Sequence, residues 1–402
     1  MEISQRSAEY IFQGTMYFFR REKILCRYQF TLRDVVDPAL LQRALTAALE
    51  SAPYYKVRLV QEKRESWLEP NPESCLVYRG SAQPDIPAQT NGYLFSVSCE
   101  GDTVYFDWYH FLMDGRGASP LFTRILELYC NLRYGTTFAN PPIPCSPAYD
   151  IRKLVADYPE PTADGAMQRD VLQTCEGAPR RTLLRLSKQS LVEKALANGV
   201  KPVSALMGLL CLAMRDYFGK KEIRYSYSAD TRAVVGVPDA RYNCVCSFQH
   251  AEQLQPDACL ADFVAGLDAK IRQDLVPENM RRTMAQQMGW VYKVDQQKAP
   301  LRIKQRVFQM GEYISGVPGD FWLSYLGDPF LPATPELEQY IKDFKVWVPP
   351  DGGSMGVEAS SLNGVITLCI ENKAEMPGLA AALRTAFEKE GITVLEAEDL
   401  DG

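Results

Sequence analysis

The chain has 402 residues, of which 46% are hydrophobic and 23% are charged, and its formal net charge is −6. This length exceeds what one hydrophobic core usually organises, so two domains are expected. The acidic balance and the lack of a basic stripe argue against nucleic acid as a main partner.

The sequence predicts neither a signal peptide nor a membrane span. The first twenty residues, MEISQRSAEYIFQGTMYFFR, are interrupted by charged residues, Gln and Gly. The most apolar stretch, VSALMGLLCLAM at 203–214, is shorter than the run of about 18 apolar residues that a membrane span needs. Eleven cysteines without a CxxC pair are typical of reduced thiols. We therefore expect a cytoplasmic protein without a membrane span. We expect a monomer, although the sequence does not indicate the oligomeric state.

In chain order, the first half mixes strands with a few helices. Residues 24–32 alternate in polarity like a strand. Asp37-Pro38 predicts a helix start, because Asp caps a helix and Pro suits its first turn. Further strands are predicted at 55–60, 65–69, 92–98 and 103–110. Ser119-Pro120 predicts the start of a helix that ends at Gly135.

The second half has the same mixed character. The stretch 136–181 contains PPIPCSP and YPEPT without a sustained period, which predicts a crossover between two halves, 1–165 and 166–402. Strands are predicted at 182–186, 222–229, 243–249, 321–326, 343–348, 355–360 and 364–370. Helices are predicted at 188–198, 202–217, 259–274, 278–312 and 377–390, followed by a short tail. Hairpins mixed with helices predict the α+β class.

The segment YHFLMDG at 109–115 is the strongest candidate for a reactive site. His110 is one of only two histidines, and it ends a strand on the face of Val104, Phe106 and Trp108. Histidine is the side chain whose ordinary pKa suits proton transfer near neutrality. Asp114 needs a cation or several donors if it is buried. Gly115 permits a left-handed bend or a close approach, and Gly117 is a second flexible point. The simpler alternative is a core histidine beside an ordinary turn.

Cys244, Cys246 and His250 are residue types that bind zinc and lie close together in the sequence. A strand would place both cysteines on one face as small buried side chains. Their spacing is not that of the usual zinc sites, so we predict no metal site.

HFLMDG resembles the HxxxDG core of the acyltransferase superfamily that includes chloramphenicol acetyltransferase, the plant-type acyl-CoA-dependent acyltransferases and nonribosomal peptide condensation domains. Many members carry a second histidine before this core, where this chain has Tyr109. The resemblance covers most of the chain and includes, in the expected order, 35–60, 194–217, YSADTRAVVG at 227–236, YNCVCSF at 242–248 and FWLSYLGDP at 321–329.

The resemblance implies two chloramphenicol-acetyltransferase-like mixed-sheet halves that form a V with a tunnel between them. It implies a free-standing enzyme, similar to alcohol acetyltransferases, that moves an acyl group from a thioester to a hydroxyl or amine without an acyl-enzyme. His110 would be the general base. Asp114, paired with Arg232, and Gly115 would support the site. Candidates for the oxyanion site or the tunnel wall are Ser324, Tyr109 and Asn243.

The resemblance implies no tightly bound cofactor, because acyl-CoA or an acyl-carrier thioester is the donor substrate. The expected partners are a small-molecule acceptor and an acyl or peptidyl carrier protein. Basic side chains that are candidates for contact with coenzyme A phosphates or an acidic carrier are Arg281, Arg282, Lys293, Lys298, Arg302, Lys304 and Arg306. The usual interpretation of such a run is a solvated helix face.

Two alternatives stay open at this point: a condensation-type enzyme that depends on a carrier protein, and a non-catalytic binding member of the fold. A serine hydrolase of the GxSxG type, a P-loop protein and a dinucleotide-binding protein are disfavoured, because the sequence lacks those motifs.

Overall fold

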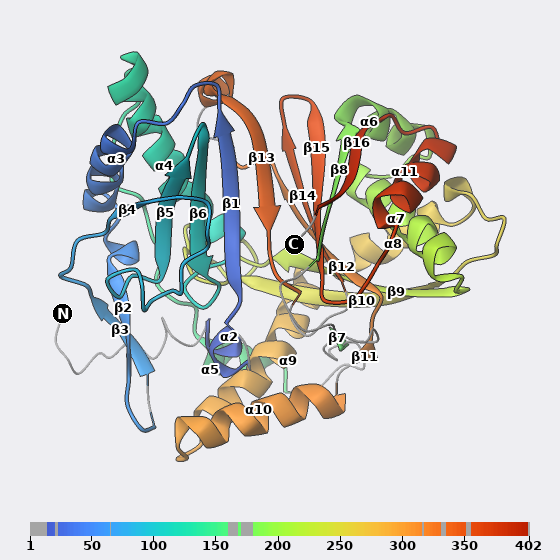
Figure 1. Cartoon of the computed structure of the whole chain (residues 1–402). Helices are drawn as coiled ribbons and strands as arrows, with labels where there is room; N and C mark the ends of the chain where they lie inside the picture. Colours follow the sequence, from blue (N-terminus) through green and yellow to red (C-terminus); the bar gives the residue numbers. More distant parts are fainter. Residues whose placement is uncertain are drawn as a thin grey trace.

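The computed structural model describes residues 14–20, 23–64, 66–159, 168–169, 180–315, 317–330, 335–350 and 355–400. Within these ranges the chain forms two large mixed β-sheets with helices packed against their outer faces (Figure 1). One sheet has the strand order β13-β1-β6-β5-β4, and the other has the order β10-β9-β12-β14-β15-β8-β16. This arrangement is the α+β fold with two mixed-sheet halves that the sequence predicts.

The five-stranded sheet comes mainly from the first part of the chain. Its early strands are β1 (Leu25–Leu32), β4 (Val77–Arg79), β5 (Phe95–Glu100) and β6 (Thr103–Tyr109). Helices α3 (Pro38–Glu50) and α4 (Gly115–Tyr134) cover its outer face (Figure 1). Asp37 caps α3 as predicted, since its carboxylate accepts from the backbone N–H groups of Ala39 and Leu40.

The fifth strand of this sheet, β13 (Ile341–Trp347), comes from the later part of the chain and pairs antiparallel with β1. It also contacts β14 and β15 of the other sheet. The proposed boundary at 165/166 therefore does not separate the two sheets completely, because β13 follows this boundary in the sequence but belongs to the sheet of β1.

The seven-stranded sheet is built from the second part of the chain. Its strands are β8 (Arg180–Ser187), β9 (Glu222–Asp230), β10 (Val245–Gln253), β12 (Phe321–Gly327), β14 (Met355–Leu362), β15 (Val365–Asn372) and β16 (Val394–Leu400). β12 runs parallel to both β9 and β14, whereas the other pairs in this sheet are antiparallel. Its outer face is covered by α6 (Lys188–Ala197), α7 (Pro202–Phe218), α8 (Val264–Asp274) and α11 (Leu379–Lys389) (Figure 1). Helix α7 is buried over most of its length, which explains the apolar run at 203–214.

A group of helices lies below the two sheets in Figure 1. It consists of α2 (Thr15–Phe19), α5 (Ile151–Asp157), α9 (Pro277–Asp295) and α10 (Leu301–Ser315). Two small sheets pair β2 (Val57–Gln61) with β3 (Ser66–Pro70), and β7 (Gln168–Arg169) with β11 (Val317–Pro318). Short 3-10 helices complete the described elements at Pro53–Tyr55, Leu260–Asp262 and Pro335–Tyr340.

Three predicted elements were wrong in type or extent. The single helix at 278–312 is two helices, because Pro300 has no N–H with which to continue α9. The tail after α11 contains an edge strand, β16, which pairs with β8. Helix α4 begins at Gly115 rather than at Ser119-Pro120, since Asp114 is its capping residue.

Helix α2 was not predicted, and part of the predicted crossover at 136–181 lies outside the described residues. In the part of the chain that the structure describes, no single helix has the length and hydropathy to cross a membrane. The bent pair of α6 and α7, with 94° between them, would meet that test together by length and composition only.

Candidate active site

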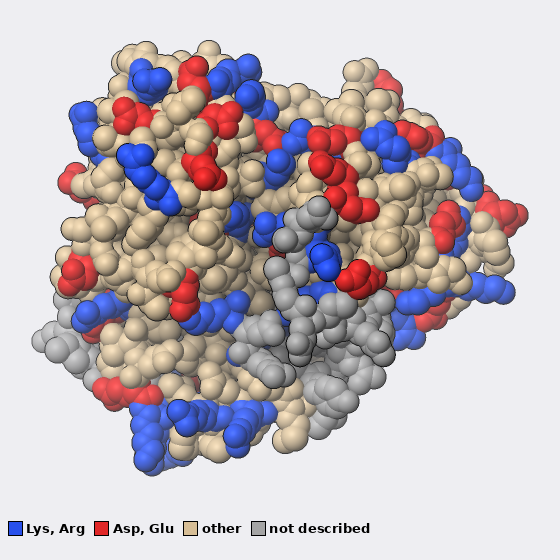
Figure 2. Space-filling model, viewed as in Figure 1, with Lys and Arg blue, Asp and Glu red and all other residues tan. Residues whose placement is uncertain are grey.

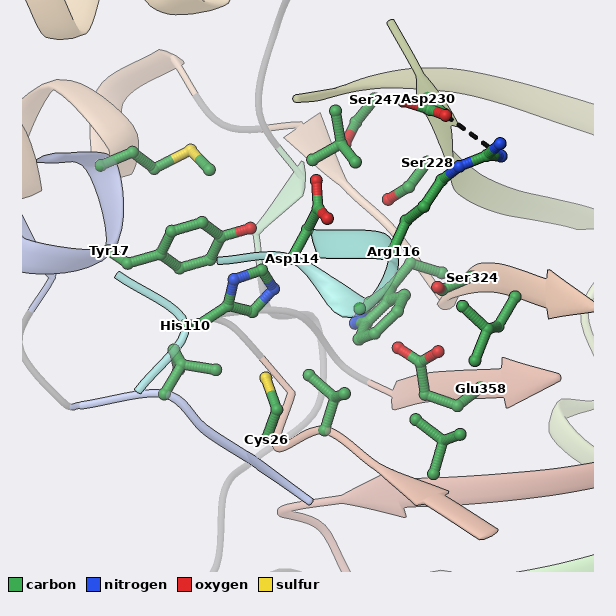
Figure 3. A pocket seen from close by; sticks show the side chains of 18 of the residues that line it. Tyr17, Cys26, His110, Asp114, Arg116, Ser228, Asp230, Ser247, Ser324 and Glu358 are labelled. Carbon is green, nitrogen blue, oxygen red and sulfur yellow. Dashed lines mark ion pairs between the residues drawn. The ribbon is translucent and has the colours of Figure 1, made fainter. Parts of the chain in front are cut away.

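A cavity of about 260 Å³ is bounded by residues from both large sheets (Figure 3). The five-stranded sheet contributes Cys26, Tyr28 and Trp108, and the seven-stranded sheet contributes the inward side chains of β9, β10, β12 and β14. Residues of α2 and α9 also line it, including Tyr17 and Met288. The cavity therefore lies where the two halves meet, which is a common location for binding sites.

His110 lines this cavity immediately after β6, on the same strand face as Trp108. Its backbone N–H donates to the carbonyl of Ile24 at 2.9 Å, which ties the residue to the chain ahead of β1. The ring stacks on Tyr17, with centroids 3.8 Å apart and planes inclined by 13°. In the described residues, the buried Nδ1 atom has no hydrogen-bond partner.

The surroundings of His110 keep its ring neutral. Burial lowers its pKa to about 4, although its own carbonyl, Asp114 and Asn243 oppose that shift. A neutral imidazole is able to accept a proton at neutral pH. The strand phase read from the sequence is thus confirmed, and the ring faces a cavity.

Asp114 is 3% exposed, and both oxygens of its carboxylate accept hydrogen bonds. Its carboxylate accepts from Arg232 Nη2 at 2.7 Å, from the backbone N–H of Gly117 at 2.7 Å and from that of Cys244 at 2.9 Å. Burial opposes ionisation, but Arg232 and the two N–H groups hold the pKa of Asp114 below its usual value. Asp114 therefore remains a buried carboxylate that caps α4.

Arg232 is the partner of Asp114, as the sequence analysis expected, and it is 3% exposed rather than a surface residue. Its remaining donors are also bonded, to Asp230 Oδ1 at 2.9 Å and to the carbonyls of Ala240 at 2.9 Å and Tyr242 at 3.0 Å. The pair thus joins the loop after β6 to the segment between β9 and β10. This linkage crosses between the two halves beside the cavity.

Gly115 and Gly117 lie in the first turn of α4, and neither has a positive φ. A Cβ atom on Gly115 would be 2.5 Å from Tyr28 Oη, and one on Gly117 would be 2.0 Å from the carbonyl oxygen of Arg241. Close packing is therefore the reason for both glycines. The idea that Gly117 is a flexible point was wrong, because it is held in a helix.

Tyr109 and Asn243 lie next to the site but do not line the cavity. Asn243 Nδ2 donates to the carbonyl of His110 at 2.7 Å. Tyr109 Oη donates to the carbonyl of Tyr17 at 3.2 Å, so the residue in place of a leading histidine holds helix α2. The prediction that these two residues line the tunnel or the oxyanion site was therefore wrong. Their side chains instead hold the backbone of His110 and Tyr17, which do line the cavity.

Ser324, on β12, does line the cavity, and its strand neighbour on β14 is Glu358. Figure 3 shows Tyr17 and His110 on one side of the cavity and Ser324 and Glu358 on the other. Glu358 is 6% exposed, and burial raises its pKa to about 8. Glu358 was not predicted as a site residue, although an acidic residue within the strand MGVEASSL is a signal. Tyr17 was not predicted either.

The basic run does not contribute to this cavity. Lys304 is buried and donates to the carbonyl of Asp295, and Arg281 donates to that of Val234. Figure 2 shows Lys and Arg side chains gathered along the lower edge of the molecule, over α10. This arrangement agrees with a solvated helix face.

The cysteine and histidine cluster forms no metal site within the described ranges. Cys244 and Cys246 are buried core residues of the segment that enters β10. His250 Nε2 instead contacts Asp274 Oδ2 at 2.5 Å.

No protein-family model and no curated protein sequence matches this chain. Solved structures that are similar include the first condensation domain of the CDA synthetase, with a TM-score of 0.62, 13% identity and coverage of 98% of both chains. Another is TRI101 of F. sporotrichioides complexed with coenzyme A and T-2, with a TM-score of 0.61, 12% identity and coverage of 97% of this chain and 99% of that chain.

A third is the TRI3 trichothecene 15-O-acetyltransferase from Fusarium sporotrichioides, with a TM-score of 0.62 and 13% identity, covering 95% of this chain and 93% of that chain. At these identities the likeness concerns the fold. The chain has the same two-halved α+β fold as these structures.

Proposed function

We propose that this protein is an acyltransferase that moves an acyl group from acyl-CoA to a hydroxyl or amine of a small-molecule acceptor. The observation that carries the proposal is a buried, neutral His110 facing a cavity between the two sheets, beside the Asp114–Arg232 pair. The fold supports it, since the similar structures include an O-acetyltransferase and a protein complexed with coenzyme A.

In the proposed reaction His110 is the general base. It takes the proton from the acceptor O–H or N–H, and the acceptor atom forms a bond to the thioester carbonyl carbon. The tetrahedral intermediate then collapses, the C–S bond breaks, and the sulfur leaves as a thiol with the proton held by His110. The acyl group passes directly to the acceptor, so no acyl-enzyme forms.

Ser324 is the proposed donor to the oxyanion of that intermediate. Its hydroxyl is hydrogen-bonded to the Glu358 carboxyl group in the unliganded protein, so the O–H would turn from Glu358 to the oxyanion during the reaction. Its hydroxyl lines the cavity on the side opposite His110, where a carbonyl between the two residues would develop its charge (Figure 3). Asp114 and Arg232 are proposed as positioning residues, because their polar atoms already form hydrogen bonds with each other and with the backbone. Gly115 supports the site by letting α4 approach Tyr28.

The test measures free thiol released from acetyl-CoA and longer acyl-CoA in the presence of a panel of alcohols and amines. We expect acceptor-dependent release that His110→Ala lowers by about 10²–10⁴-fold, the usual contribution of a general base. His250→Ala is the matched control, because it removes the other histidine of the chain, which lies outside the cavity. Full activity of a folded His110→Ala protein would show that the proposed base is wrong.

Two other outcomes identify the alternatives. Rejection of acyl-CoA with acceptance of an acyl-carrier thioester would make the protein a carrier-dependent condensation-type enzyme. Binding of a thioester without any transfer, over the whole acceptor panel, would make it a non-catalytic member of the fold.

A further inference from the structure

Glu358 is a buried carboxyl group that faces the cavity without a cationic partner among the described residues. It is 6% exposed, and its side chain points into the cavity opposite His110 (Figure 3). Its neighbour on β12 is the hydroxyl of Ser324, and the charged group that acts on it is another carboxylate, Glu371. A buried carboxylate is costly unless a cation or several donors compensate for its charge.

The other acidic groups nearby each have an arginine. Glu371 accepts from Arg181 at 2.6 Å, outside the cavity. Asp114 and Asp230 line the cavity and pair with Arg232 at 2.7 and 2.9 Å. Glu358 therefore differs from these carboxylates, because no cationic side chain among the described residues pairs with it.

The cationic side chains of the cavity wall contact groups other than Glu358. Arg232 and Arg116 both pair with Asp230, Arg116 at 3.2 Å. Arg20 lies by the Tyr17 ring, 5.8 Å from its centroid, at the His110 side. A ligand that spans the cavity would thus meet the His110 ring at one end and the Glu358 carboxyl group at the other.

We propose that Glu358 binds a positively charged nitrogen of the acceptor, so that the acceptor is an amino alcohol or a diamine whose reacting group lies at His110. This inference rests on the proposed function, because it identifies the cavity ligand as the acyl acceptor. It makes Glu358 a specificity-determining residue.

The protonation of Glu358 provides the basis for selectivity. Burial raises its pKa to about 8, Ser324 opposes that rise and Glu371 adds to it. An ammonium group beside the carboxyl would favour its ionised form, whereas a neutral hydroxyl would not. A charge-assisted hydrogen bond of this kind is about twice as strong as a neutral one.

The experiment measures binding without requiring acyl transfer. The affinity of the full-length protein is measured by calorimetry for amino alcohols of three to eight carbons and for the diols of matched length. We expect the best amino alcohol to bind at least about tenfold more tightly than its diol, which corresponds to about 1.4 kcal/mol. Glu358→Gln should reduce that ratio to near one.

Glu127→Gln is the matched control, because Glu127 is also 6% exposed but lies on α4 outside the cavity. It should leave the ratio unchanged. Equal binding of amino alcohols and diols to the unaltered protein would overturn the proposal even if Glu358→Gln fails to fold. So would a preference that survives in a folded Glu358→Gln protein.

The same ligands separate this inference from the proposed function. Preferred binding of amino alcohols without thiol release from any acyl donor would reject acyl transfer and keep the Glu358 site. Thiol release with neutral alcohols and no preference for amines would keep acyl transfer and reject the Glu358 site.

Discussion

Arg232 Nη2 lies 2.7 Å from Asp114 Oδ1, and both side chains are almost completely buried. The pair joins two segments 118 residues apart in the sequence, one between β6 and α4 and the other after β9. It therefore links the loop that carries His110 to the opposite half of the molecule. The first prediction follows from this contact.

Arg232→Ala should lower the free energy of unfolding by about 3–5 kcal/mol, because it leaves the Asp114 carboxylate buried without its cation. Urea denaturation measures the change. Arg116→Ala is the control, since its side chain is 71% exposed and its ion pair with Asp230 should contribute less than about 1 kcal/mol. Similar small losses for both variants would contradict a stabilising role for the buried pair.

Gly115→Ala should destabilise the protein by about 1–3 kcal/mol, because the new methyl group meets the Tyr28 hydroxyl at 2.5 Å. Tyr28→Phe removes that oxygen and leaves Cζ at 3.6 Å, an ordinary contact. The double variant should therefore recover much of the loss. A double-mutant cycle by denaturation gives the coupling, and strictly additive effects would rule out this contact as the cause.

The pH dependence of acyl transfer should reflect the lowered pKa of His110. The base is active when neutral, and a pKa of about 4 in place of the usual value near 6.5 keeps it neutral through mild acid. The part of kcat/KM that depends on His110 should stay constant from pH 7 down to about 5.5. An acid limb centred near pH 6.5 in a folded enzyme would show that the ring is solvated.

Tyr17→Ala should move that acid limb to higher pH, because it exposes one face of the His110 ring to water and reduces the desolvation that lowers its pKa. The pH profile of kcat/KM measures the shift. Tyr17→Phe keeps the stacked ring and should retain the original profile. A loss of activity in Tyr17→Ala without a shift would indicate that Tyr17 only shapes the cavity.

Ser324→Ala should lower kcat by about 10²–10³-fold with a smaller effect on KM, as expected for the loss of a donor to the oxyanion. Steady-state kinetics with acyl-CoA separates the two parameters. Ser96→Ala is the control, because Ser96 is a buried strand serine of β5 outside the cavity. Equal effects of the two substitutions would favour packing over a donor role.

Local sequence patterns were sufficient for much of the fold. The cap at Asp37 and the face shared by Trp108 and His110 were predictable, because they depend on residues a few positions apart. Asp114 was expected to support the site, whereas its role as the capping residue of α4 was not predicted. The Ser119-Pro120 pair is a strong start signal, and the stronger contacts of Asp114 outweigh it.

Contacts between distant segments were not readable in this way. Strand β16 has a weak pattern, and its pairing with β8 determines it. β13 has the pattern of a strand but no local signal for joining the sheet of β1. Tertiary context decides such elements, since a strand is completed by its neighbours.

By itself the sequence determined the α+β class and the position of His110 at a strand end, because periodicity is a property of the chain, and the family resemblance implied Arg232 as the partner of Asp114. Only the tertiary structure decided that Tyr17 stacks on His110, that Tyr109 faces away from the cavity, and that Glu358 faces it without a described cation. These features depend on how two sheets meet, and burial and desolvation arise only when they do.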